Sequence, residues 1–202
     1  QLISAYQKEN IIEIKYVYQK NSGKHVSHNR ALDISNGILF LILDSDDQIL
    51  PDKLNVIWDT WQTYGHGNEK KYAGILAHCI NQHKEFIGKK WPNNFKSRSV
   101  IQLWIEDEEV YGEKMPIYQT HILKKYKFPE LKGSSEFVPE GIVWMQIAKK
   151  YEMILLEDIT RIYEMNNQDA LSMSAKDDQI GSWGKAIFFS VLISFSNQYF
   201  IM

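Results

Sequence analysis

Three aspartates that follow a run of apolar residues are the strongest chemical signal in the chain. Asp44, Asp46 and Asp47 come directly after the segment Ile38–Leu43, in which every residue is apolar. Such a run is typical of a buried strand, and open α/β sheets bind ligands at the carboxyl ends of their strands. Clustered carboxylates repel one another, and their hard oxygens suit Mg²⁺ or Mn²⁺, which bridge phosphate oxygens. The alternative is a solvated turn whose aspartates cap the next helix.

A glycine and a lysine lie one predicted helix before this acidic turn. Gly23 and Lys24 open a segment that extends to Ser35 and has helical character, and Asn36 and Gly37 then stop it. A glycine turn followed by lysine at a helix start is a plausible anion site. An ordinary surface lysine is the alternative. The apolar residues of this helix predict its buried face, which consists of Val26, Ala31, Leu32 and Ile34.

The remaining pattern predicts an α/β domain. Strands are expected over residues 12–18, 72–80 and 152–165, and helices from Pro51 and over residues 139–151. Strands that alternate with helices in the first half favour a sheet with parallel crossover connections. Residues 186–202 form an apolar stretch that we expect to be helical.

Composition narrows the class of protein further. A length of 202 residues suits one domain with a sizeable core, and a net charge of −2 provides no basic field to attract nucleic acid. The single cysteine, Cys79, lies in an apolar run and favours a cytosolic setting and a core position. No uninterrupted apolar run reaches the roughly 18 residues that span a bilayer.

Residues 23–54 closely resemble the central stretch of family 2 glycosyltransferases. In that family a Gly-x-Lys-like turn and an asparagine-bearing helix lead into a strand that ends in Asp-x-Asp, as they do here. Residues 6–25 fit the preceding helix and strand, and residues 137–151 resemble the acceptor-side helix of a bacterial branch. The resemblance covers roughly residues 1–165. Family members begin with a further strand and loop, which we expect upstream of Gln1.

The resemblance implies an α/β fold of the GT-A type, in which helices flank a mostly parallel central sheet. It implies a single domain over residues 1–202. Residues 1–80 would form the nucleotide-sugar-binding half and residues 81–165 a smaller acceptor-binding half, followed by a C-terminal helical extension over 166–202.

The resemblance also implies inverting, metal-dependent transfer from a nucleotide-diphospho-sugar, with UDP as the expected nucleotide. By position, Asp46 matches the carboxylate that contacts Mn²⁺ or Mg²⁺, and Asp44 matches the one near the ribose and sugar. Lys24 and Asn29 match positions that bind the nucleotide-sugar donor. Glu140, at the start of a helix, matches the catalytic base, which would take the proton of the attacking hydroxyl.

The acceptor is expected to be a saccharide or lipid-linked hydroxyl, in the synthesis of cell-surface polysaccharide or glycolipid. Trp144 lies one helical turn after Glu140 and is a weaker candidate for a wall of the acceptor site, because packing in the core or at an interface is the favoured alternative for it. The apolar stretch at residues 186–202 is expected to pack within the fold or in a homodimer. Its alternative is peripheral association with the inner face of the membrane, which agrees with a cytoplasmic location.

Two other kinds of protein remain open, and one is excluded. A haloacid-dehalogenase-like phosphatase would use Asp44 as its nucleophile, although Asp47 and Gln48 follow where that superfamily favours glycine or threonine. A non-catalytic sugar-nucleotide-binding subunit would keep the same residues. A calcium loop of the EF-hand type is excluded, because Ile49 and Asn55 stand where it needs glycine and glutamate.

Overall fold

The central feature of the protein is a mixed β-sheet. The computed structural model describes residues 2–92, 96–105, 112–130, 137–165 and 182–199. Within these residues the strand order is β1-β5-β3-β6-β2, and β4 also pairs with β6. The strands are β1 (Leu39–Leu41), β2 (Gln48–Ile49), β3 (Tyr72–Asn81), β4 (Ser97–Arg98), β5 (Lys114–Gln119) and β6 (Glu152–Tyr163).

The α/β class is confirmed, but the expectation of a mostly parallel sheet is wrong. Only the β3–β6 pair is parallel in the described residues, and the other pairs are antiparallel. The physical reason is that β5 lies between β1 and β3 and runs against both. Apolar runs show that a strand is covered on both faces, and this covering does not fix the direction of its neighbours. Strands β1, β3 and β6 still run the same way, so their carboxyl ends share one edge.

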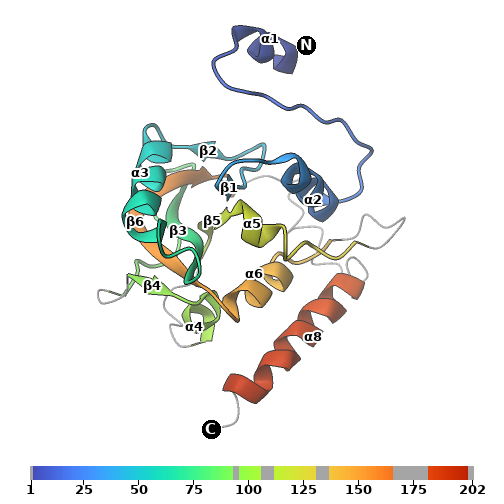
Figure 1. Ribbon diagram of the computed structural model, residues 1–202, viewed down its shortest axis with the longest axis vertical. Coiled ribbons are helices and arrows are strands. Elements are labelled where there is room, and N and C mark those ends of the chain that lie inside the picture. The colour runs from blue at the N-terminus through green and yellow to red at the C-terminus, as the bar shows by residue number, and fades with distance from the viewer. Residues whose placement is uncertain (1, 93–95, 106–111, 131–136, 166–181, 200–202) are drawn as a thin grey trace.

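Helices cover both faces of this sheet (Figure 1). Alternate residues of β3 divide between two cores: Leu76 packs with α2, α4, α6 and α8, whereas Ile75 and Ala77 pack with α3 and its continuation η1. The predicted core position of Cys79 is confirmed. The helices are α1 (Leu2–Glu9), α2 (Lys24–Ile34), α3 (Lys53–Thr60), η1 (a π-helix, Trp61–Gly65), α4 (Val100–Ile105), α5 (Thr120–Leu123), α6 (Gly141–Ala148) and α8 (Ser182–Tyr199).

The buried face of α2 differs from the one that its apolar residues predicted. Of that predicted face only Leu32 is buried, and Ile34 is exposed. The residues that face the core have helical spacing but are mostly polar, namely His25, His28, Asn29 and Leu32. The amide of Asn29 makes hydrogen bonds and the imidazole of His28 packs against aromatic rings, so polar residues occupy the buried face and apolar periodicity misplaces this helix by part of a turn.

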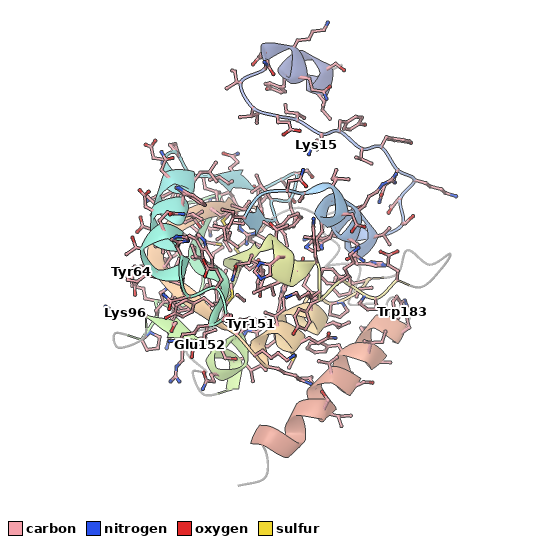
Figure 2. The ribbon with its side chains drawn as sticks, in the orientation of Figure 1. Lys15, Tyr64, Lys96, Tyr151, Glu152 and Trp183 are labelled. Carbon is pink, nitrogen blue, oxygen red and sulfur yellow. The ribbon has the colours of Figure 1, made fainter. Side chains whose placement is uncertain are left out.

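The strand predicted over residues 12–18 is not formed. Residues 10–23 have neither helix nor strand, and they join α1, which stands apart in Figure 1, to α2. Ile12 and Tyr18 are 69% and 82% exposed, and Lys15 reaches the main body by donating to the carbonyl of Ile34 at 3.5 Å (Figure 2). An alternating segment becomes a strand only when a neighbouring strand takes its backbone hydrogen bonds.

Helix α8 packs one side against α6. Its Phe188 lies so close to Gly141 that a Cβ on Gly141 would come within 2.7 Å of the ring, so the glycine permits the close approach. On the other side of α8, Phe189 and Ile193 are 58% and 70% exposed. Among the described helices none is both long and apolar enough to cross a membrane.

Candidate functional site

The acidic turn lies on the sheet edge where β1, β3 and β6 end. Strand β1 ends at Leu41, and the Asp47 backbone N–H then donates to the Asp44 carbonyl at 3.1 Å, which closes a turn before β2. Because β1 and β2 lie at opposite ends of the strand order, residues 42–47 must cross the ends of the strands between them. The turn is therefore held at the place where α/β sheets bind ligands.

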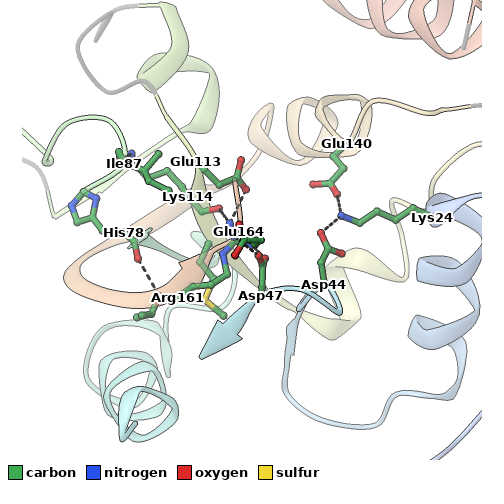
Figure 3. Close-up of polar contacts among 12 residues, drawn as sticks. Lys24, Asp44, Asp47, His78, Ile87, Glu113, Lys114, Glu140, Arg161 and Glu164 are labelled. Carbon is green, nitrogen blue, oxygen red and sulfur yellow. Dashed lines mark hydrogen bonds and ion pairs between the residues drawn. The ribbon is translucent and has the colours of Figure 1, made fainter. Parts of the chain in front are cut away.

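Lys24 joins the acidic turn to the start of α6. Its Nζ lies 2.7 Å from Oδ2 of Asp44 and 2.9 Å from Oε1 of Glu140 (Figure 3). Gly23 precedes it with a φ of 88°, a conformation that favours glycine, and so sets the direction from which the chain enters α2. Three predicted site residues from separate segments therefore meet at one ammonium group.

The cluster of Lys24, Asp44 and Glu140 is sheltered but open to solvent. Its side chains are 37–38% exposed. Burial opposes the charge on Lys24, but the carboxylates of Glu140 and Asp44 more than compensate, so the pKa of Lys24 is raised. The ammonium therefore stays charged at neutral pH and offsets part of the repulsion between the two carboxylates.

Asp46 lies at the exposed tip of the acidic turn. In the described part of the chain, no group of three His, Cys, Asp or Glu side chains is arranged to hold a metal ion. Magnesium is often bound through one or two carboxylates, with waters and substrate phosphates completing its shell. The hard oxygens of Asp46 fit that kind of partial site, which would need the phosphates of a ligand.

Asp47 belongs to a second, buried network that the sequence reading missed. Its carboxylate Oδ2 lies 3.2 Å from Nη1 of Arg161, whose Nη2 donates to Oε1 of Glu113 at 2.7 Å. Burial raises the pKa of Asp47 and of Glu113, and Arg161 opposes both shifts. A signal was present, because Arg161 is a lone cation inside the apolar strand β6, and such a residue needs a carboxylate partner.

The side chain of Asn29 makes its hydrogen bonds within the protein, whereas the resemblance implied that it binds the donor substrate. Its Nδ2 donates to the carbonyl of Phe128 at 2.9 Å and to Oε1 of Glu130 at 2.6 Å, and its Oδ1 accepts from the Phe128 N–H at 3.0 Å. Both donors of the buried amide are thus used within the protein. Asn29 connects α2 to the segment after α5, and these hydrogen bonds do not support its role in donor binding, which stays a prediction.

Trp144 also has a structural position. Its ring stacks on Tyr118, with centroids 4.6 Å apart, and only 7% of the residue is exposed. A sugar packs on an aromatic face only when that face is accessible, and here Tyr118 covers it. The residue one turn after Glu140 thus packs in the core, and this position does not support the role of Trp144 as an acceptor wall, which stays a prediction.

His28 is a buried residue of α2 that packs next to the site. It lies one turn after Lys24 on α2 and meets the rings of Phe128 and Trp144, with centroid distances of 4.9 Å and 6.3 Å. Burial lowers its pKa to about 4, although Glu140 opposes this shift. The neutral imidazole thus packs among the rings of Phe40, Phe128 and Trp144 in the core next to the site.

The pKa of His28 makes the stability of the fold dependent on pH. An unfolded histidine has a pKa near 6.5, so between pH 6.5 and about 4 the unfolded chain binds more protons than the folded chain. The free energy of unfolding should therefore fall by about 2 kcal/mol for this residue between pH 7 and pH 5. Urea unfolding of wild type and His28→Leu at both pH values measures this. The variant should lose less stability, and an equal loss in both proteins would contradict the prediction.

Comparison with known proteins matches the first part of the chain, which includes Lys24 and the acidic turn, to one enzyme family. Residues 1–94 match the family described as Glycosyl transferase family 2. An uncharacterized glycosyltransferase of Methanocaldococcus jannaschii is 22% identical over 187 residues, which cover 91% of this chain and 61% of the relative.

Solved structures of S. aureus TarS have a similar fold. The complex with UDP-GlcNAc has a TM-score of 0.54 at 14% identity, and the complex with UDP has 0.51 at 15%. Each match covers 98% of this chain, and the chain spans 60% and 59% of the two TarS chains. At such identities the likeness shows a shared α/β fold.

Proposed function

We propose, on the premise that residues 1–94 form a glycosyl transferase family 2 domain, that this protein transfers a sugar from a UDP-sugar to a hydroxyl acceptor with inversion. The observation that supports this most is the contact of Lys24 with both Asp44 and Glu140. It brings a candidate donor-binding turn and a candidate base to one open site at the carboxyl end of the sheet. The TarS relatives hold UDP-GlcNAc and UDP, which suggests the class of donor to test first.

Asp46 and Asp44 would bind the donor. We propose that Asp46 holds Mg²⁺ or Mn²⁺ together with the donor's phosphate oxygens. The metal would neutralise the charge that develops on the departing diphosphate. Asp44, fixed by Lys24, would accept hydrogen bonds from hydroxyl groups of the ribose or sugar.

Lys24 would position both halves of the site. An ammonium has three N–H donors, and Asp44 and Glu140 each accept from it or pair with it. The remaining donor could reach an oxygen of the donor substrate. Because Lys24 is half-buried and charged, it would also lower the cost of bringing an anionic diphosphate close to the aspartates.

Glu140 would act as the general base. The acceptor oxygen forms a bond to the anomeric carbon while the bond from that carbon to the diphosphate oxygen breaks. The hydroxyl proton passes to the Glu140 carboxylate, and UDP leaves with the electron pair. Attack from the face opposite the leaving group inverts the configuration of the carbon.

The exposed apolar side chains of α8 bear on the acceptor and on the location of the protein. We propose a saccharide or lipid-linked acceptor at the inner face of the membrane, in cell-surface polysaccharide or glycolipid synthesis. The exposed Phe189 and Ile193 on α8 would suit either a lipid surface or a second copy of the protein.

Calorimetry with UDP and UDP-GlcNAc, each with MnCl₂ or with EDTA, tests the proposal. We expect both nucleotides to bind in the presence of Mn²⁺ and binding to weaken strongly with EDTA, since the phosphates lose their metal. Binding without release of UDP over time would favour a non-catalytic subunit. Hydrolysis of an aryl phosphate that Asp44→Asn abolishes would favour a phosphatase, and an absence of nucleotide binding would refute the proposed function.

A further inference from the structure

Arg161 links three segments at the edge of the sheet that carries the candidate site. Its Nη2 donates to Oε1 of Glu113 at 2.7 Å and to the carbonyl of Lys114 at 3.2 Å, and its Nη1 lies 3.2 Å from Asp47. The arginine side chain is 5% exposed and that of Asp47 is 1% exposed. The guanidinium therefore ties the beginning of β5 to the acidic turn from inside the protein.

A buried arginine fixes the groups that it contacts. The planar guanidinium presents its donors in a rigid fork, so a carboxylate bound to it has a defined position. Asp47 is turned inward by this contact, away from the exposed tip of the turn. Arg161 fixes the carboxylate of Glu113 in the same way, although the Glu113 side chain remains 43% exposed.

Glu113 faces the site that contains Lys24. Burial raises the pKa of Glu113 and Arg161 opposes this shift, while Glu140 raises the pKa and Lys24 lowers it by smaller amounts. Figure 3 shows the carboxylates of Glu113 and Glu140 on the same side of the acidic turn, with Asp44 and Asp47 across from them. Among the described residues Arg161 occupies Oε1 of Glu113, which leaves Oε2 to accept hydrogen bonds.

We propose that Glu113 accepts hydrogen bonds from hydroxyl groups of the transferred sugar, and that Arg161 is the positioning residue that holds it there. This inference rests on the proposed function. The diphosphate would lie at the acidic turn and the reacting carbon beside Glu140, so the sugar ring would reach from the turn toward the side on which Figure 3 shows Glu140 and Glu113. A carboxylate repels phosphate but accepts hydrogen bonds from hydroxyl groups, so Glu113 suits the sugar and not the nucleotide.

Glu113→Gln tests this role by comparing the affinity for UDP-GlcNAc, which carries the sugar, with the affinity for UDP, which does not. The substitution keeps the shape and removes the charge, so affinity for UDP-GlcNAc should fall about tenfold, as for the loss of a hydrogen bond to a charged group. Affinity for UDP should change less than twofold, because UDP lacks the sugar. Calorimetry with both ligands and Mn²⁺ measures the ratio. The control is Asp59→Asn, which removes an exposed carboxylate on α3 and should alter neither affinity.

A second variant tests Arg161 without removing the positive charge from the buried network. Arg161→Lys keeps the charge but not the fork, so it should lower the affinity for UDP-GlcNAc more than that for UDP. A purely structural role would lower the melting temperature and weaken both ligands equally. If neither variant changes the ratio while wild type binds both ligands, the role of Glu113 is refuted and the proposed function stands. If wild type binds neither ligand, the proposed function fails and this inference fails with it.

Discussion

Glu140→Gln is expected to lower the rate of UDP-GlcNAc hydrolysis about a thousandfold while affinity for UDP-GlcNAc stays within about twofold of wild type. Glutamine can still accept the hydrogen bond from Lys24, whose Nζ lies 2.9 Å from the Glu140 carboxylate, so the site should keep its geometry. The amide cannot take a proton from the attacking water or hydroxyl. Release of UDP, followed with and without an added acceptor, measures the rate.

A matched pair elsewhere in the fold provides the control for Glu140→Gln. Asp158 pairs with Lys53 at 2.5 Å and is 39% exposed, much as Glu140 pairs with Lys24. Asp158→Asn should leave hydrolysis unchanged, because that pair lies outside the candidate site. Hydrolysis by Glu140→Gln at the wild-type rate would mean that another group takes the proton.

Asp46→Ala should weaken the Mn²⁺-dependent binding of UDP by at least about a hundredfold. Asp46 is the exposed carboxylate of the acidic turn, and removal of a metal ligand disrupts both the metal and the phosphates that it would hold. Calorimetry in MnCl₂ measures the loss. In EDTA the wild type and the variant should bind UDP equally weakly, because the metal contribution is absent from both.

Ser45→Ala is the control for Asp46→Ala. It alters the neighbouring exposed residue of the same turn and keeps all three carboxylates. Its affinity for UDP in MnCl₂ should match the wild type. An Asp46→Ala variant that binds UDP with Mn²⁺ as tightly as Ser45→Ala would remove Asp46 from the metal site and leave the fold assignment intact.

Sequence patterns predicted those parts of the molecule that depend on local spacing. The helix from Lys24, the long strand from Tyr72 and the strand from Glu152 are confirmed, because turn residues bound the helix and apolar segments of strand length mark the two strands. The resemblance assigned Lys24, Asp44 and Glu140 to one site, and the structure brings their side chains into contact. Their roles in binding and catalysis stay predictions.

The features that sequence patterns missed depend on contacts between distant segments. Asn29 and Trp144 were assigned by position along the chain, but their partners Phe128 and Tyr118 come from other elements and place both residues in the core. Periodicity identifies the buried face of a strand and cannot show that β5 runs against β1 and β3. Arg161 stands in the strand from Glu152, but its two carboxylate partners come from other segments, so the network itself needs the structure.

The segment that joins β1 to β2 is barely long enough to cross the sheet. Neighbouring strands lie about 4.8 Å apart, and β1 and β2 are four such steps apart in the strand order, which makes about 19 Å. The seven residue steps from Leu41 to Gln48 reach at most about 24 Å when fully extended, and the turn between Asp44 and Asp47 shortens that reach. Deleting one residue here would detach a strand or straighten the turn. The width of the sheet therefore holds the acidic turn in its place across the strand ends, the turn itself sets the spacing of its aspartates, and a cation or sugar that binds there must fit both.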